Sequence, residues 1–329
     1  MDVSTQQPVQ SAVLKPGRPK TLTGDPFFRG LVLSAGVGVL LILGAVIVVM
    51  VVGGMPAFGQ FGPGFLISKV WNPVTQHFGA AAPVFGTIAS SVLALLIAVP
   101  LSFGTAFWLT TLAPPAASSV IGMAVQLLAA VPSIIFGMWG FFVLVPLVAH
   151  YVQPAAKALF GHVPVVSVLI SGPPFGTGLF TAAVILAIMI MPSITAVMRD
   201  VFASIPSVLR ESAYGLGATR WEVMRRVVLP WSRQGVVGGI VLGMGRAMGE
   251  TMAVTFVIGD SNHIGWSIFA PANTIASLIA LEFPESPAGS LKLASLMALG
   301  AILMAISFVT LWCSRMLLAR GQNSTGKRS

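Results

Sequence analysis

Long uninterrupted runs of apolar residues dominate this chain, and charged residues are confined to short segments between them. About 20 apolar residues carry a helix across the hydrocarbon core of a bilayer, so such runs are typical of membrane-spanning helices. The pattern predicts six spans, at residues 31–52, 84–112, 120–148, 178–197, 234–258 and 291–317. The predicted fold is therefore an all-α integral membrane protein with six transmembrane helices.

The segments around these runs predict how the chain begins and where it bends. Residues 1–24 are polar and too long for a signal peptide, so they are predicted to be a disordered tail before a retained first helix within 25–60. Pro100 and Pro132 fall inside the second and third runs and are predicted to kink those helices. Residues 273–283 (NTIASLIALEF) are predicted to form a short interfacial or re-entrant helix.

Composition excludes a soluble protein, and the histidines and the single cysteine do not have the pattern of a metal site or a disulfide. Only 8% of the residues are charged, against about 25% in soluble domains, and the mean hydropathy is +0.92. The four histidines are scattered and the single cysteine is Cys313, so no metal-ligand spacing exists and an internal disulfide is impossible. Neither a metal site nor a resident cofactor is expected.

The basic residues predict the orientation in the membrane. Most of the 18 lysines and arginines gather in three segments: Lys15, Arg18, Lys20 and Arg29; Arg199, Arg210, Arg220, Arg225, Arg226 and Arg233; and Arg315, Arg320, Lys327 and Arg328. Under the positive-inside rule these segments lie in the cytoplasm, which places both termini there. Topology then accounts for the net charge of +9, and a nucleic-acid partner is not expected.

The basic loop of residues 199–233 has the signals of a helix–turn–helix. Pro206 suits the first turn of a helix, and Gly217 suits its C-terminal stop. Thr219 and Glu222 have the spacing of a capping box, which starts a second helix.

This loop contains more than orientation requires. Pro230 is expected to close it before the fifth span, while Tyr214, Trp221 and Val223 add apolar side chains. The loop is therefore predicted to dock on a partner protein.

The segment ESAYGLGATRWEVMRRVVLP (211–230) resembles the EAA loop of ABC importer permeases. Glu211 and Ala213 open it, Ser212 replaces the usual middle alanine, and Gly217 follows six residues after Glu211. In that family the loop forms a coupling helix that inserts into a groove of the ATP-hydrolysing subunit. The residues that the resemblance assigns to ATPase coupling are Glu211, Ala213, Gly217, Leu229 and Pro230.

Four segments look more specifically like the phosphate-specific permeases of the PstC type: AAVPSIIFG (129–137), RDVFASIPSVLRESAYGLGATRWE (199–222), GRAMGETMAV (245–254) and TIASLIALEF (274–283). The resemblance implies a type I ABC importer permease of MetI-like architecture, with its transmembrane domain over residues 80–318 and a cytoplasmic tail at 319–329. It further implies a phosphate importer in a bacterial cell membrane. The implied partners are a PstA-type sister permease, two ATP-binding subunits and an extracytoplasmic phosphate-binding protein. Because the chain has no GxxxxGK[ST] loop, ATP is expected to bind to the partner subunits.

Two charged residues stand near the middle of the fifth run, where a charge costs on the order of 2.5–3.5 kcal/mol on insertion scales. Arg246 is followed by Glu250 one helical turn later, on the same face of the predicted helix. A buried ion pair is often no more stable than an apolar replacement. The pair therefore either locks the helix against a neighbour or borders the path of an anion, whose oxygens suit a planar guanidinium. The resemblance implies the second role, in which Arg246 and Glu250 belong to the substrate path.

The same run carries Gly235, Gly239 and Gly243 at intervals of four, which predicts a close approach to another helix. Two alternative functions stay open. A permease for another oxyanion, such as sulfate or molybdate, would have the same architecture. A secondary transporter that uses Arg246 and Glu250 as a proton relay would have an internal repeat, and no convincing one is present.

Overall fold

Nearly all of the described chain is helical. The computed structural model describes residues 25–325, so the predicted tail of residues 1–24 and residues 326–329 of the predicted C-terminal tail lie outside it. The chain divides into two compact units, Met1–Val48 and Val49–Ser329. The described part of the first unit is the beginning of α1 (Asp25–Phe61), and the large apolar side chains of this beginning are exposed. A helix that is apolar on all sides suits a lipid environment.

Six helices within the described residues are long and apolar enough to cross a membrane, which confirms the predicted number. They cover Pro26–Phe61, Ala81–Leu112, Ser133–Phe160, Leu179–Ala203, Arg220–Met248 and Leu291–Met316. The first, second, fourth and sixth match the predicted runs, although the first and fourth extend several residues further. The third and fifth differ from the prediction.

The predicted third helix over residues 120–148 is wrong, because the chain breaks at Pro132. The helix α4 (Pro115–Ala129) ends before this proline, and α5 (Ser133–Trp139) begins directly after it. Pro132 is extended, with ψ of 138°, and a proline ring also disfavours the helical conformation in the residue before it. After α5 the helical path continues through η2 (Gly140–Leu144), α6 (Val145–Leu147), η3 (Val148–Val152) and α7 (Gln153–Phe160).

The other predicted proline site does not interrupt its helix. The helix α3 (Ala81–Phe107) runs through Pro100 and passes directly into the wider turns of η1 (Trp108–Leu112). A proline in a helix removes one backbone hydrogen bond, and here the helix continues despite that loss.

The helix α9 (Leu179–Ala203) is the centre of the second unit. It packs against α3, α4 and α12 (Leu229–Met248). Its buried side chains form the middle of the largest hydrophobic core; they include Ile185, Leu186, Ile190, Ile194, Met198 and Phe202.

The glycine stripe of α12 faces α9, which confirms the predicted close approach. A Cβ atom added at Gly235 would lie 2.4 Å from Val201, and one at Gly243 would lie 2.6 Å from Ile194. Because Gly239 is also in this stripe, the two helices approach closely over a little more than two turns.

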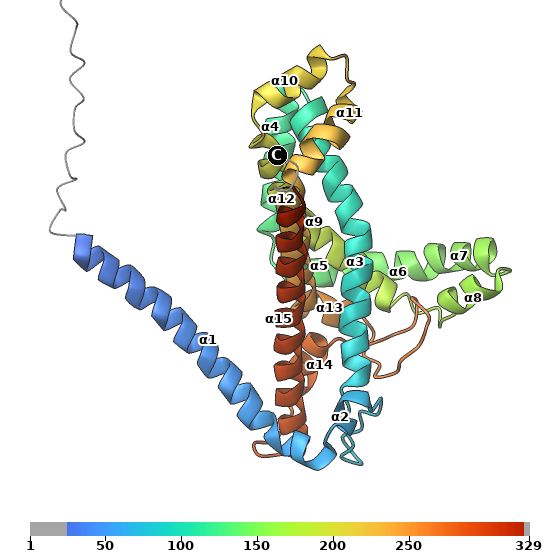
Figure 1. The fold of residues 1–329 in the computed structure, drawn as a ribbon. Coiled ribbons are helices and arrows are strands. Elements are labelled where there is room, and N and C mark those ends of the chain that lie inside the picture. The colour runs from blue at the N-terminus through green and yellow to red at the C-terminus, as the bar shows by residue number, and fades with distance from the viewer. Residues whose placement is uncertain (1–24, 326–329) are drawn as a thin grey trace, which may run out of the picture. The chain divides into compact units, whose positions relative to one another are not determined.

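A second core lies at the other end of the unit from α10 (Ser207–Gly215) and α11 (Arg220–Val223), as Figure 1 shows. It joins α2 (Gly64–Ile67), α14 (Ile275–Glu282) and α15 (Leu291–Thr325). The predicted short helix within 273–283 is α14, and Ile275 and Leu278 are fully buried. This helix is thus part of the packed interior rather than an exposed surface element.

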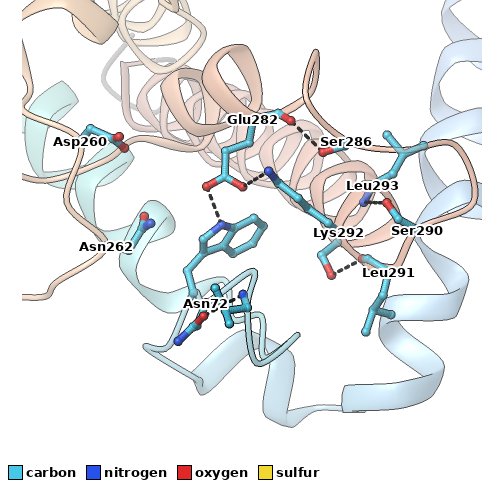
Figure 2. A network of polar contacts seen from close by, with 12 residues as sticks. Asn72, Asp260, Asn262, Glu282, Ser286, Ser290, Leu291, Lys292 and Leu293 are labelled. Carbon is cyan, nitrogen blue, oxygen red and sulfur yellow. Dashed lines mark hydrogen bonds and ion pairs between the residues drawn. The ribbon is translucent and has the colours of Figure 1, made fainter.

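A polar clamp holds this end together. Lys292 Nζ lies 3.1 Å from Glu282 Oε2, and the two side chains face each other in Figure 2. Trp71 Nε1 donates a hydrogen bond of 2.9 Å to the other oxygen of Glu282. Since these side chains are largely buried, the clamp fixes α14 to the start of α15 and to the segment before α3.

A helical hairpin of α7 and α8 (Pro164–Ile170) stands out from the bundle (Figure 1). A small third core of Val148, Ile170 and Phe269 lies at its base, and Lys157 Nζ donates a hydrogen bond of 3.0 Å to the Gly172 carbonyl.

Candidate substrate-path and coupling sites

Arg246 lies in the last turn of α12, where the helix ends. Its Nη1 donates a hydrogen bond of 3.1 Å to Ser193 Oγ on α9. The arginine side chain is exposed on the surface of the chain, so its remaining N–H groups are accessible. A guanidinium that one neutral hydroxyl orients, and that is otherwise open, can bind an oxyanion in a bidentate manner.

The predicted continuous helix over residues 234–258 is wrong. α12 stops at Met248, and the chain re-enters a helix only at α13 (Met252–Val257). Glycine at position 249 favours such a stop, because its backbone gains little from staying helical. Arg246 and Glu250 are consequently not one turn apart on a single helix face.

Glu250 has a different partner from the one that the spacing predicted. Its Oε1 accepts a hydrogen bond of 3.3 Å from the Ala253 backbone N–H, in the first turn of α13. Among residues 26–316, whose side chains the structure describes, the ion pairs are Arg199–Asp200 and Lys292–Glu282, so Arg246 and Glu250 do not form one. A direct ion pair between these two charges, which the lock alternative assumed, is therefore absent, and each side chain has its own partner: Ser193 on α9 for Arg246 and the α13 backbone for Glu250.

Ser193 is the residue near Arg246 that the sequence did not single out. It follows Pro192 inside α9 and is partly exposed. A hydroxyl next to a proline in an apolar helix is a weak signal, and the same signal at Pro132 and Ser133 marks the start of α5 instead. Only the packing of α12 against α9 shows which serine meets the arginine.

The predicted helix–turn–helix exists, and Gly217 makes the turn. α10 ends at Gly215, and Gly217 has a φ of +82°, as its position predicted. The Ala218 N–H donates to the Ala213 carbonyl at 3.1 Å, and the Gly217 N–H donates to the Tyr214 carbonyl at 2.9 Å. This is the Schellman arrangement, which satisfies carbonyl groups that a helix end leaves free.

The second helix starts with the predicted capping box. Thr219 Oγ1 accepts from the Glu222 N–H at 3.3 Å, and the Glu222 carboxylate accepts from the Thr219 N–H at 2.9 Å. Leu216, at the tip between the two helices, is 90% exposed. Glu211 is also exposed, whereas Ala213 is partly buried against the core. The tip therefore presents apolar and acidic groups outward on a well-defined turn.

Two details of this loop differ from the prediction. Val223 is buried in the main core and cannot contact a partner, while Trp221 is half-exposed and packs edge-on against Phe107 at 5.9 Å. Pro230 does not close the loop, because the helical path from Arg220 continues to Met248. The wide turn η4 (Met224–Val228) lies just before Pro230 and passes into α12 without a break.

These features together define a class of protein. A six-span helical membrane protein with an exposed, capped helix–turn–helix and an accessible arginine at a helix break has the architecture of a transport permease. Among the described residues no group of three or more His, Cys, Asp or Glu side chains can hold a metal ion.

The comparisons with known proteins are specific. Residues 98–320 match the model of the family "Binding-protein-dependent transport system inner membrane component". The chain belongs to this family. It is 51% identical to the phosphate transport system permease protein PstC of Mesorhizobium japonicum, with 92% of each chain covered. It is 53% identical to the PstC protein of Pasteurella multocida, over 88% of this chain and 90% of that one.

Solved structures of other transporters share the fold. A chain of the MetNI methionine ABC transporter aligns with a TM-score of 0.54 at 15% identity, over 77% of this chain and 99% of that chain. A chain of a bacterial alginate ABC transporter aligns with a TM-score of 0.56 at 16% identity, over 91% and 97%. The fold is therefore the MetI-like fold of type I ABC importer permeases, and the chain is a multi-pass permease component rather than the ATPase.

Proposed function

We propose that this chain is the PstC-type permease of an ATP-driven importer of inorganic phosphate. The names of its relatives support the substrate, since PstC proteins that are about half identical to it are phosphate transport system permeases. The chain would form half of the translocation path, opposite a PstA-type sister permease. An extracytoplasmic phosphate-binding protein would deliver the anion, and two ATP-binding subunits would supply the energy.

One observation carries the site assignment: the exposed guanidinium of Arg246 at the break between α12 and α13. Phosphate has several acceptor oxygens, and the planar fork of arginine binds two of them at once. Ser193 orients the guanidinium through a neutral hydroxyl, so the full positive charge remains available. Glu250, close in sequence and turned to the α13 backbone, would limit how tightly the anion is held and so favour its release.

The coupling role is assigned to the exposed tip of the helix–turn–helix. Leu216 and Gly217 lie at this tip and Glu211 is exposed in the middle of α10, and these residues would contact the ATP-binding subunit. Leu229 and Pro230, which end the EAA-like segment, lie in the first turn of α12 and would transmit a displacement of the loop into that helix. The basic loop and both termini would then be cytoplasmic under the positive-inside rule.

Uptake of radiolabelled phosphate by liposomes that contain the reconstituted complex tests this proposal. We expect uptake that depends on ATP and on the binding protein. A tenfold excess of sulfate or molybdate should leave this uptake unchanged, which requires a selectivity for phosphate of about a thousandfold, or about 4 kcal/mol. Arg246→Gln should abolish uptake while the complex assembles normally. Arg315→Gln, a change at an exposed arginine near the end of α15, is the matched control and should transport normally.

Each alternative function predicts a different result. Strong competition by sulfate or molybdate would identify another oxyanion as the substrate. Uptake that follows a proton gradient without ATP would indicate a secondary transporter, and unchanged uptake by Arg246→Gln would remove Arg246 from the path.

A further inference from the structure

A groove of about 590 Å³ opens where α4 and η1 pass the junction of α9 and α10. It lies at the end of the bundle that carries the coupling loop (Figure 1). Two arginines line it, Arg199 from α9 and Arg210 from α10. Topology alone explains why such residues are basic, but it does not explain why two of them line the same groove.

The two guanidinium groups are poorly neutralised. Arg199 pairs with Asp200 at 3.1 Å, but the Asp200 side chain is 68% exposed, and an exposed ion pair neutralises its partner only weakly. Arg210 donates to the Phe202 carbonyl, and in the described part of the chain no carboxylate forms an ion pair with it. Two guanidinium groups therefore line the groove, and the one carboxylate paired with them, that of Asp200, faces solvent.

Polar groups on the opposite wall add hydrogen-bonding capacity. Ser119 and Gln126 of α4 line the groove, and the structure shows no hydrogen bond from either side chain to another described residue. Gly122 on the same helix leaves room for Arg199, whose Nη1 lies only 3.0 Å from the place where a Cβ atom would stand. A larger residue there would displace the guanidinium, so the sequence of α4 fits the arginine.

A tetrahedral oxyanion suits this arrangement better than a planar carboxylate does. Guanidinium groups from two helices, with a hydroxyl and an amide across the groove, converge on one space from different directions, and a phosphate group offers acceptor oxygens in each of them. Met123 adds an apolar edge on the α4 side. We propose that this groove binds a phosphate group, supplied either by the headgroup of an anionic phospholipid or by free inorganic phosphate.

This site is separate from the proposed transport site. Arg246 and Ser193 do not line the groove, and Ser193 precedes Arg199 by six residues of α9, or about 9 Å along the helix axis. The two residues also lie about 120° apart around that axis, so they point to different sides of α9. The groove could therefore bind its ligand whether or not Arg246 belongs to the phosphate path.

Binding to the purified complex tests the proposal with two probes. One probe is radiolabelled inorganic phosphate in an equilibrium binding assay. The other is dioleoylphosphatidylglycerol, counted per complex by native mass spectrometry after exchange from detergent, with the zwitterionic dioleoylphosphatidylcholine as its comparison. The variants are Arg199→Gln, Arg210→Gln and their combination, and the control is Arg225→Gln, an exposed arginine outside the groove.

We expect one of the two probes to bind to the wild type and to Arg225→Gln. The double variant should bind it at least about tenfold more weakly, since a hydrogen bond to a charged group contributes that much or more. Retention of phosphatidylglycerol over phosphatidylcholine identifies a lipid headgroup, and binding of inorganic phosphate identifies the free anion. Because Arg246 is intact in every variant, loss of this binding is distinguishable from loss of the transport site.

Ser119→Trp tests the groove without changing either arginine, so its result does not depend on whether the arginine variants fold. It fills the groove from the exposed face of α4 and leaves both arginines in place, so it should weaken binding as the double variant does. The proposal is overturned if neither probe binds to the wild type, or if the double variant and Ser119→Trp both bind the probe as the wild type does.

Discussion

The turn at Gly217 offers the sharpest test of the coupling loop, because its geometry separates backbone strain from packing. Gly217 has a φ of +82°, and a Cβ atom added there would meet no other atom within 4 Å. Gly217→Ala therefore introduces no clash, and its whole cost comes from placing an L-residue in the left-handed region. That cost is about 1–2 kcal/mol, and it falls on a turn that two backbone hydrogen bonds hold.

Gly215 is the matched control, two residues earlier in the same loop. It is the last residue of α10, it has no positive φ, and an added Cβ would also meet no atom within 4 Å. Gly215→Ala should be neutral or should stabilise the helix by up to about 1 kcal/mol. The two variants make the same chemical change at equally exposed positions, so only the backbone conformation separates them.

Hydrogen exchange in the purified complex measures the difference directly. The amides of Gly217 and Ala218, which close the turn, should exchange about 5- to 30-fold faster in Gly217→Ala, as 1–2 kcal/mol of local destabilisation requires. The same variant should show weaker docking of the ATP-binding subunit and less ATP hydrolysis in response to the loaded binding protein. If Gly217→Ala and Gly215→Ala exchange and transport alike, the turn does not set the conformation of the coupling loop.

Three further predictions test the rest of the site and the topology. Glu250→Gln keeps an oxygen that can accept a hydrogen bond from the Ala253 N–H, so stability should change by less than about 0.5 kcal/mol while uptake falls. Glu250→Ala should in addition lose about 0.5–1 kcal/mol of stability in a thermal unfolding assay. Normal uptake by the glutamine variant would show that the charge of Glu250 has no role in transport. Gly235→Ala should destabilise the complex by about 1–3 kcal/mol through contact with Val201, whereas Gly238→Ala, whose added Cβ meets no atom within 4 Å, should not; equal melting temperatures would contradict the close approach. Cysteines at positions 4 and 324, in a background with Cys313→Ser, should react with an impermeant maleimide only in inside-out vesicles, and labelling of intact cells would overturn the predicted orientation.

The hydrophobic pattern was sufficient for the number and approximate place of the membrane helices, because length and apolar character decide whether a segment can span a bilayer. It was not sufficient for helix ends inside apolar sequence. Pro132 interrupts the helix within a run that has no charged residue, and α12 stops at Gly249 within the run that carries Arg246 and Glu250. Pro100 and Pro230, by contrast, lie within continuous helical paths. Whether a proline interrupts a helix depends on its place relative to the helix start and on the packing around it, which hydropathy does not encode.

The local signals in the coupling loop were reliable for a related reason. Thr219 with Glu222, and Gly217 with its positive φ, act through backbone groups only a few residues away, so their geometry follows from the sequence itself. The partner of Arg246 depends instead on contact between helices that are 53 residues apart in the chain. Helical spacing pointed to Glu250, but that reasoning assumed that α12 continues past Gly249.

The continuity of the fifth long helix would let a displacement of the proposed coupling loop reach the proposed substrate site. From the capping box at Thr219 the helical path runs without a break to Met248, so Arg220 and Arg246 are joined by 26 residues of helix, about 39 Å at 1.5 Å per residue. The glycine stripe presents bare backbone to the Val201, Val197 and Ile194 side chains of α9, and glycine has no side chain that could interlock with them. The path then ends within three residues of Arg246. Motion of the loop along the helix axis would therefore change the distance between Arg246 on α12 and Ser193 on α9, while Glu250 stays with the separate helix α13. A helix break directly after the arginine lets the guanidinium move relative to the carboxylate, which an unbroken helix would hold at a fixed spacing.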